Sequence, residues 1–593
     1  MQQFTWERVA DPGFFAENRL PACSDHIWYE SVTALEKGES ALRQCLDGVW
    51  QFHYAENFTQ VPEAFAAAAG DCRGWESIRV PGHIQMQGHG VPQYANIQYP
   101  WDGHENVWPG EIPQRFNPVG CYVKYFTVPE GWAGRPVHIR FDGAESGLAV
   151  FCNGSYVGYA TDSFTPHTFD LTPYLQKGEN KLSAAVIRWT SASWCEDQDF
   201  FRFSGLFRSV WLLAVPAAHI ADVKLETPLA EDYSAGTLAV QLNTQGEGRV
   251  CAALYAPGGA CVGRAEEALA AQGVLRFEIP VKAPLLWSAE VPNLYRLRLT
   301  VFDAAGRETE AVEQKTGFRR FVIRDGILEL NGRRIVFRGV NRHEFSAKTG
   351  RAVAREETLR DVLTMKRNNI NAIRTCHYPD DSYLYELCDE YGLYLLDECN
   401  LETHGTWDPL ARGETDMAGL PLPHNKPEWQ PMLLDRVESI YQRDKNHASV
   451  LIWSCGNESY GGKVIFEMSQ RFRALDGSRP VHYEGICHDR SYNATSDIES
   501  RMYPPVEEIK AWLAKDRSKP FLCCEYAHAM GNSNGALYKY TDLTDTDPSY
   551  QGGFIWDYID QAITKKDRYG REFQAYGGDF DDRPCDYSFS GNG

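Results

Sequence analysis

The stretch SVLIWSCGNE, residues 449–458, decides the fold of this chain. It is a short apolar run that ends abruptly in polar residues, which is typical of a buried strand. Comparable runs occur at NAIRTCHYP (371–379), LYLLDECN (393–400) and FLCCEYAH (521–528). Segments with helical spacing of apolar residues separate most of these runs, for example MLLDRVESIYQRDKN (432–446). This alternation of strands and helices predicts a parallel sheet.

Eight strand positions can be counted from RRIVFRGVN (333–341) to GGFIWDY (552–558). Eight strands with helices between them are the elements of a (β/α)8, or TIM, barrel, which we place at residues 318–593. We expect the barrel to lack its last helix, because the sequence stops at Gly593 soon after the eighth strand. A doubly wound open sheet is the alternative, but no GxGxxG motif opens any of the helices.

The residues before the barrel show a different spacing of apolar residues. From 46 to 216, short alternating apolar runs such as VHIRFDG (137–143) are separated by Gly, Pro, Asn and Asp, which predicts an antiparallel sandwich or barrel. Residues 217–317 repeat this style over a length that suits an immunoglobulin-like β-sandwich. Residues 1–45 form an extended N-terminal segment in this division. Two β domains and a barrel agree with the roughly three to five domains that such a length predicts.

The composition narrows the class of protein. With 59 Lys and Arg against 80 Asp and Glu, the formal net charge is −21, which disfavours binding to nucleic acid or to an anionic membrane surface. No segment has the pattern of a signal peptide, and no apolar run is long enough to span a membrane. The 16 Cys are scattered without a CxxC pair, as expected for reduced thiols in a cytoplasmic protein. Aromatic residues reach 13%, a weak indication of sugar binding.

Active sites of (β/α)8 barrels collect at the carboxyl ends of the strands. Two carboxyl groups that emerge there from separate strands suit a glycosidase, in which one donates a proton and the other attacks the anomeric carbon. Glu458 and Glu525 suit these roles best, since each directly follows an apolar strand. For either residue alone, an ion pair or a helix cap is an equally good explanation. The other polar residues at the strand ends are Asn341, Arg342, His343, Glu344, Arg374, His377, Asp397, Glu398, Asn457, His528 and Asp557.

Several longer motifs resemble one known family. They are NHASVLIWSCGNES (446–459), CCEYAHAMGNS (523–533), RGVNRHE (338–344), RTCHYP (374–379), YGLYLLDECNLETHG (391–405), QGGFIWDYIDQ (551–561) and AYGGDF (575–580). The amino-terminal half adds WERVADPGFFAENRLPACS (6–24), YANIQYPW (94–101) and WCEDQDFFRFSGLFRSV (194–210). Together they are similar to the β-galactosidases of glycoside hydrolase family 2 over nearly the whole chain.

This resemblance implies a jelly-roll β-sandwich at 46–216 and a retaining exo-β-galactosidase that hydrolyses lactose and other β-galactosides through a galactosyl-enzyme intermediate. Glu525 would be the nucleophile and Glu458 the acid/base, with their carboxyl groups about 5–5.5 Å apart. Asn457 would bond the sugar 2-OH, and Tyr503 would contact the nucleophile. The further substrate contacts implied by matching motifs are Asn96, His343, His377, His528 and Trp556, the last as an apolar floor under the galactosyl ring.

The resemblance also implies two metal sites. Glu402, His404 and Glu458 correspond to Mg²⁺ ligands, which waters could complete to an octahedral shell. Without the family, the spacing of Glu402 and His404 would be weak support, and a structural histidine would be the better explanation. Asp199, the carbonyl of Phe589 and Asn592 correspond to the ligands of a Na⁺ (or K⁺) ion near the galactose 6-OH.

Other interpretations remain open at this stage. A β-glucuronidase of the same family is disfavoured because EYAHAMGNS follows the nucleophile and no NxK signature is found. A galactoside-binding remnant without turnover is the alternative from another class. Family members continue beyond the point that matches Gly593, so we expect a truncated chain whose full-length form is a homo-oligomer. If the chain truly ended there, apolar surface near the first and eighth strands would be exposed and activity would be poor.

Overall fold

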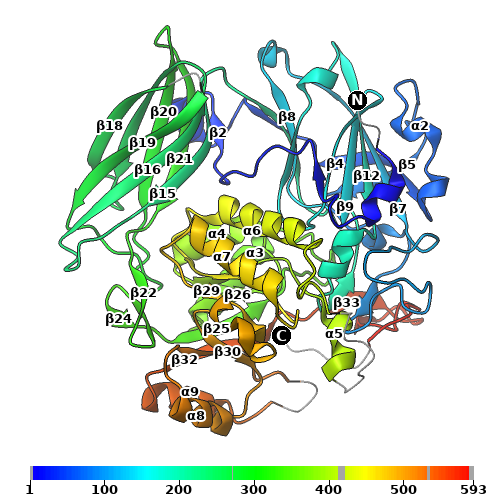
Figure 1. The fold of residues 1–593 in the computed structure, drawn as a ribbon. Coiled ribbons are helices and arrows are strands. Elements are labelled where there is room, and N and C mark those ends of the chain that lie inside the picture. Colours follow the sequence, from blue (N-terminus) through cyan, green and yellow to red (C-terminus); the bar gives the residue numbers. More distant parts are fainter. Residues whose placement is uncertain (1–3, 270–271, 412–420, 530–533, 587–593) are drawn as a thin grey trace.

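The computed structural model describes residues 4–269, 272–411, 421–529 and 534–586. Two β-sandwiches lie above a barrel in the view of Figure 1, and the N-terminal segment runs between them. Among the described residues, no helix is long and apolar enough to cross a membrane.

The first sandwich packs two antiparallel sheets around a core that includes Trp50, Phe141 and Leu182. Alternate residues of a strand such as β8 (Val137–Phe141) are buried, as expected for a sheet with one face in the core. The larger sheet has the order β1 (Ala16–Glu17), β10 (Ser155–Ala160), β9 (Gly147–Cys152), β12 (Glu179–Ile187), β7 (Val119–Thr127), β4 (Gly48–Ala55) and β5 (Glu76–Val80). The smaller has the order β11 (His167–Asp170), β8, β14 (Val210–Ala214) and β3 (Arg43–Cys45).

The second sandwich is the predicted immunoglobulin-like domain. One sheet contains β15 (His219–Glu226), β16 (Ala235–Gln245) and β19 (Gln272–Lys282). The other contains β18 (Cys261–Leu269), β17 (Gly248–Tyr255), β20 (Tyr295–Asp303), β21 (Glu308–Thr316) and β2 (Trp28–Tyr29). Since β1 joins the first sandwich and β2 the second, the N-terminal segment is part of both domains. A short sheet of β22 (Phe321–Arg324), β23 (Ile327–Leu330) and β24 (Arg333–Arg334) leads into the barrel.

The barrel contains eight parallel strands, as predicted. In chain order they are β25 (Phe337–Arg342), β26 (Ala372–Thr375), β27 (Tyr394–Glu398), β28 (Val450–Ser454), β29 (Val481–His482), β30 (Glu499–Met502), β31 (Phe521–Tyr526) and β32 (Tyr550–Tyr558). The first strand pairs with both the second and the eighth, which excludes the open-sheet alternative. Between β29 and β30 there is no ladder, but Nε2 of His482 lies 2.9 Å from Oγ of Ser500, and this hydrogen bond joins the two strands.

Helices connect most of the barrel strands. They are α3 (Arg355–Arg367), α4 (Ser382–Tyr391), α5 (His404–Ala411), α6 (Gln430–Asp444), α7 (Lys463–Leu475), α8 (Val506–Lys515) and α9 (Leu537–Thr546). Local sequence explains their limits. For α4, Asp381 caps the start by accepting the N–H of Tyr383, and Gly392 ends the helix in the left-handed conformation, at φ 75°. Between β29 and β30 only 3-10 turns occur among the described residues.

The strands next to the closing point of the barrel are well covered. The large apolar side chains Phe337 of β25 and Phe554 and Trp556 of β32 are buried. The exposed apolar residues lie instead on the hairpin that follows, β33 (Ile563–Lys566) and β34 (Glu572–Ala575), where Tyr569 and Phe573 are exposed. The exposure expected near the first and eighth strands of a chain that truly ends at Gly593 stays a prediction. In the described residues after β32, up to 586, no helix is present.

Candidate active site

The carboxyl ends of the barrel strands bring the predicted charged residues together. Arg374 lies in β26, Glu398 in β27 and Glu525 in β31, while Asn457 and Glu458 follow β28. All are buried except Glu458, which is partly exposed. Because a buried charge is costly unless it is paired, the hydrogen bonds of these residues define how the site is held.

The guanidinium of Arg374 is the centre of the group. Its Nη1 donates to Oε1 of Glu525 at 2.8 Å and to Oδ1 of Asn341 at 3.0 Å. Its Nη2 donates to Oδ1 of Asn457 at 2.8 Å, and its Nε to Oε2 of Glu398 at 2.9 Å. A single side chain therefore connects four other strands or strand ends, and it fixes Glu525 relative to the neighbour of Glu458.

Glu525 has a second partner in Tyr503, whose phenol donates a hydrogen bond to Oε2. The backbone N–H of Tyr503 also donates to the carbonyl of Glu525 at 2.9 Å. Burial and the charge of Glu525 raise the pKa of Tyr503 well above its usual value, so the phenol stays protonated and remains a donor. Tyr503 and Glu458 have φ of 51° and 31°, left-handed conformations that are uncommon for residues other than glycine.

Two histidines and a tryptophan lie beside the nucleophile candidate. The ring of His377 stacks on Trp556 at 5.3 Å, and that of His343 meets Trp556 edge-on at 5.4 Å. Nδ1 of His377 lies 2.7 Å from Oε1 of Glu398, which leaves Nε2 3.6 Å from Oε1 of Glu525. Nδ1 of His343 lies 3.1 Å from the Tyr378 hydroxyl.

The other ring nitrogen of His343 shows where a ligand belongs. Within the described part of the chain, its Nε2 is buried and has no hydrogen-bond partner. Burial and the charges of nearby His377 and arginines lower its pKa well below the usual range, so the ring is neutral. A neutral ring can both donate and accept, which suits a hydroxyl group. His528 completes this side, with its ring 5.8 Å from Tyr503 and 6.2 Å from Trp556.

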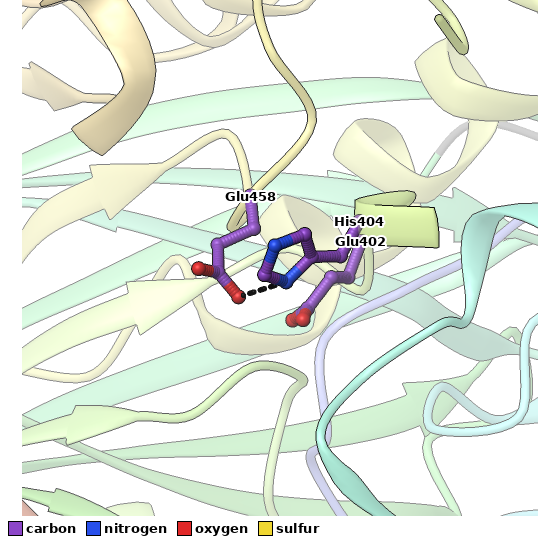
Figure 2. Close-up of side chains that lie close together, drawn as sticks. All are labelled: Glu402, His404 and Glu458. Carbon is purple, nitrogen blue, oxygen red and sulfur yellow. Dashed lines mark ion pairs between the residues drawn. The ribbon is translucent and has the colours of Figure 1, made fainter. Parts of the chain in front are cut away.

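Glu458 lies in a second cluster, with Glu402 and His404 (Figure 2). Ligand atoms of the three residues all lie within 4.8 Å of one another, and Nδ1 of His404 is 2.9 Å from Oε2 of Glu458. Glu402 is fully buried, and in the described structure its Oε1 has no hydrogen-bond partner. Two carboxylates and an imidazole that converge on one point, with an unsatisfied oxygen, form a donor set that fits a divalent cation.

The charges in this cluster perturb one another. Burial alone would raise the pKa of Glu458, but the His404 imidazolium outweighs it and lowers the pKa to about 2. Burial would lower the pKa of His404, but the Glu458 carboxylate raises it to about 9. Burial and the charge of Glu458 raise the pKa of Glu402 well above its usual value. Without a cation, the raised pKa favours the neutral form of Glu402, while the Glu458 carboxylate pairs with the His404 imidazolium.

The first sandwich supplies part of this cluster's support. The backbone N–H of Glu402 donates to the carbonyl of Cys195 at 3.1 Å, and that of Asp197 donates back to Glu402 at 3.1 Å. Oδ2 of Asp197 accepts the N–H of Gly405 at 2.9 Å. The loop that carries Glu402 and His404 is therefore pinned to the sandwich domain.

The remaining predicted residues lie in the same region or outside the described residues. Asp199 follows this sandwich loop and accepts a hydrogen bond from Tyr94 at 2.8 Å, and burial raises its pKa to about 8. Asn96 is held by its backbone N–H, which donates to Asp586 at 2.7 Å. Phe589 and Asn592 lie outside the described residues.

Three residues of the site had no predicted role. Arg374 and Glu398 were noted at strand ends without a role, and their positions become clear only from the hydrogen bonds between strands. Glu484 follows β29 and accepts the backbone N–H of Glu458 at 2.9 Å. Burial and the charge of Glu458 raise the pKa of Glu484 to about 8. The rule that inspects polar strand ends would have found it in PVHYEG (480–485).

Comparison with known proteins gives matches along the entire chain. The family model "Glycosyl hydrolases family 2, sugar binding domain" matches residues 43–216, "Glycosyl hydrolases family 2" matches 218–319, and "Glycosyl hydrolases family 2, TIM barrel domain" matches 321–593. A β-galactosidase of Halalkalibacterium halodurans is 52% identical over 99% of this chain, which spans 58% of that protein. A "Beta-galactosidase large subunit" of Latilactobacillus sakei is 41% identical, over 98% of this chain and 95% of that subunit.

Solved structures agree on the fold. A Bifidobacterium dentium β-glucuronidase complexed with coumarin-3-O-glucuronide superposes with a TM-score of 0.72, over 89% of this chain and 93% of that one. Its sequence identity is 21%, so this likeness concerns the fold alone.

Proposed function

Because the chain belongs to glycosyl hydrolase family 2, we propose that it is the catalytic part of a retaining exo-β-galactosidase that releases terminal β-galactose from lactose and related β-galactosides. The observation that carries this proposal is the pair of strand-end carboxyl groups, Glu525 and Glu458, in one hydrogen-bonded site. Arg374 bonds Glu525 and also Asn457, the residue before Glu458. Relatives that are 41–52% identical carry the name β-galactosidase, which favours galactose as the sugar.

Glu525 is suited to attack because two donors hold its carboxyl group in place. Arg374 and Tyr503 both donate to its carboxylate, and these bonds orient it. In the first step, a Glu525 oxygen bonds to the anomeric carbon while the glycosidic C–O bond breaks and the departing oxygen takes the proton of Glu458. In the second step, water bonds to the anomeric carbon, gives its proton to Glu458 and releases Glu525.

Glu458 alternates between acid and base in this scheme. Its ionised form, which the pairing with His404 favours, is the one that accepts a proton from water in the second step. Glu402, His404 and Glu458 would hold Mg²⁺, which would supply positive charge and fix the orientation of the Glu458 carboxylate. A metal-bound imidazole is neutral, so His404 would no longer offer Glu458 an imidazolium partner.

The galactosyl ring would lie between the histidines and Trp556. The unsatisfied Nε2 of His343, together with His377, His528 and Asn96, offers partners for its hydroxyl groups. The Trp556 face would carry the apolar side of the ring, and Asn457 would bond the 2-OH. Asp199 would bind Na⁺ or K⁺ near the 6-OH, with Phe589 and Asn592 as proposed further ligands.

The chain spans little more than half of its single-chain relatives but nearly all of a protein named a large subunit. We therefore propose that additional polypeptide, continuous with this chain or supplied as a separate subunit, takes part in the complete enzyme. The formation of a homo-oligomer stays a prediction. A β-glucuronidase and a non-catalytic remnant are not favoured, since the named relatives are β-galactosidases and both carboxyl groups are in place.

The test is an assay of p-nitrophenyl β-galactoside against the β-glucuronide, with and without EDTA. We expect turnover of the galactoside only, a loss of rate in EDTA, and recovery on addition of Mg²⁺. NMR of the first product should show β-galactose, because two displacements retain configuration. Preference for the glucuronide, or α-galactose as the first product, would contradict the proposal.

A further inference from the structure

Three rings that the proposed mechanism does not use lie together next to Glu458. They are Trp407 of α5, Tyr460 in the loop after β28, and His488 just after the 3-10 turn Glu484–Cys487, and we call them the aromatic wall. The ring of His488 lies 5.0 Å from Trp407 and 5.8 Å from Tyr460, on which it stacks at 21°. Trp407 and Tyr460 are 6.2 Å apart, so each ring contacts the other two.

The wall is attached to Glu458 through the backbone. The indole N–H of Trp407 donates to the carbonyl oxygen of Glu458 at 2.6 Å, and Tyr460 follows Glu458 by two residues. Glu458 also affects the pKa of His488. Burial lowers this pKa, and the Glu458 carboxylate partly offsets that effect by raising it. The three rings therefore lie beside the residue that is proposed to donate the proton, with Trp407 bonded to its backbone.

Part of the wall remains accessible. Trp407 is buried at 7% exposure, whereas Tyr460 is half-buried and His488 is exposed. Tyr460 carries a hydroxyl and His488 a ring with two nitrogens, so both partly accessible rings have polar edges. A ring face with polar edges beside it is an arrangement that binds ligands with both apolar and hydroxyl-bearing surfaces.

The loop that presents Tyr460 has an unusual backbone. Glu458 and Tyr460 have φ of 31° and 59°, and Gly461 and Gly462 have φ of 147° and 107°. A Cβ atom on Gly462 would lie 2.6 Å from the ring of His424, so only glycine fits there. Such a backbone is costly in this conformation, and here it places the Tyr460 ring against His488 and Trp407.

From this geometry we infer that the aromatic wall binds the sugar that leaves, so that the enzyme prefers a hexose as the aglycone. The inference rests on the proposed function. The glycosidic oxygen must lie at Glu458 when it is protonated, so the leaving group must lie beside Glu458 as well. Arg374, His377 and Trp556 lie around Glu525, where the galactosyl ring would bind. The aromatic wall lies beside Glu458 instead. The polar edges of Tyr460 and His488 favour a hydroxylated ring over a purely apolar one.

The experiment compares leaving groups in the full chain and in its Tyr460→Ala, His488→Ala double variant. The measured quantity is kcat/KM for lactose divided by kcat/KM for trifluoroethyl β-galactoside, whose leaving group is too small to reach the wall. We expect this ratio to fall roughly tenfold in the variant, as for the loss of one stacked ring and its contacts. Transfer of galactose to added glucose should fall in parallel.

Tyr391→Ala is the matched control, because it also removes a partly exposed aromatic ring. Tyr391 ends α4, at the opposite end of the barrel from the strand ends that form the site, and should leave the ratio unchanged. A variant ratio equal to that of the unmodified chain would overturn the inference while the proposed function stands. If the unmodified chain cleaves neither galactoside, the proposed function itself fails, and the inference with it.

Discussion

At the scale of single residues, the two carboxyl groups have different expected phenotypes. Glu525→Gln should abolish turnover of every galactoside, because no other group can form the bond to the anomeric carbon. Glu458→Gly should keep a measurable rate on aryl galactosides with good leaving groups, which need no proton, and azide should raise this rate by replacing water in the second step. The measurement is release of p-nitrophenol with and without azide. Rescue of Glu525→Gln but not of Glu458→Gly would reverse the two roles.

Glu398 is expected to make stability depend on pH. Burial would raise its pKa, but Arg374 outweighs this effect and lowers it from 4.5 to about 2. The stability from this pairing is therefore fully present above pH 4.5 and is lost as the pH falls towards 2. Glu398→Gln should lower the free energy of unfolding by on the order of 3 kcal/mol at pH 7.

Urea unfolding of the unmodified chain and of Glu398→Gln at several pH values measures this difference. The difference in free energy of unfolding between the unmodified chain and Glu398→Gln should become smaller as the pH falls from 5 to 3. The exposed Glu508, on α8, is the control, and Glu508→Gln should lie close to the unmodified chain at each pH. A gap for Glu398→Gln that does not change with pH would contradict the assignment.

At the scale of elements, the contact between the sandwich loop and the loop of Glu402 and His404 should control metal affinity. Asp197 accepts the N–H of Gly405 and also pairs with Arg202 at 2.8 Å. Asp197→Asn weakens this support without touching a proposed ligand. The Mg²⁺ concentration for half-maximal activity should rise about tenfold or more, as when other outer partners of metal ligands are lost.

Titration of EDTA-treated enzyme with Mg²⁺ measures this effect. Asp232→Asn, on an exposed loop of the second sandwich, is the control and should not change the half-maximal concentration. If Asp197→Asn lowers the rate equally at all Mg²⁺ concentrations, the loop contact has no part in metal binding.

The elements of the barrel could be predicted from the sequence because their signals are local. Each strand near the site is an apolar run that stops at a polar residue, and this pattern located Glu458 and Glu525. The hydrogen bonds of Arg374 could not be predicted, because they depend on how five strands between residues 337 and 526 are placed in the barrel. The pairing of Cys195 and Asp197 with Glu402 joins two domains, and no periodicity in either segment indicates it.

At the scale of the whole molecule, the N-terminal segment was also beyond prediction. Its strands β1 and β2 are two residues long, too short to show any alternation, yet they join different sandwiches. The segment contacts the barrel as well, since Arg19 forms an ion pair with Asp435 of α6. Three domains are thus connected by residues that sequence analysis could describe only as extended.

Because the segment joins all three domains, we expect them to unfold together. We also expect a buried ion pair of the segment to contribute to the free energy of unfolding of the whole chain. His447, at the start of the β28 run, lies 3.1 Å from Asp25 and 2.7 Å from Asp389. Burial alone would lower the pKa of His447, but the two carboxylates raise it well above its usual value. Asp25→Asn should therefore lower the free energy of unfolding by roughly 1.5–3 kcal/mol, the contribution of a buried hydrogen bond to a charged group.

The matched control is Glu390→Gln, which breaks an exposed pair with Lys315 and should cost about 0–1 kcal/mol. Unfolding is followed by tryptophan fluorescence and by residual activity in the same urea series. Because the segment contributes to both sandwiches and to the barrel, the two signals should change at one midpoint, and Asp25→Asn should shift both equally. Separate midpoints, with only one shifted by Asp25→Asn, would show that the domains unfold independently and that the segment does not couple them.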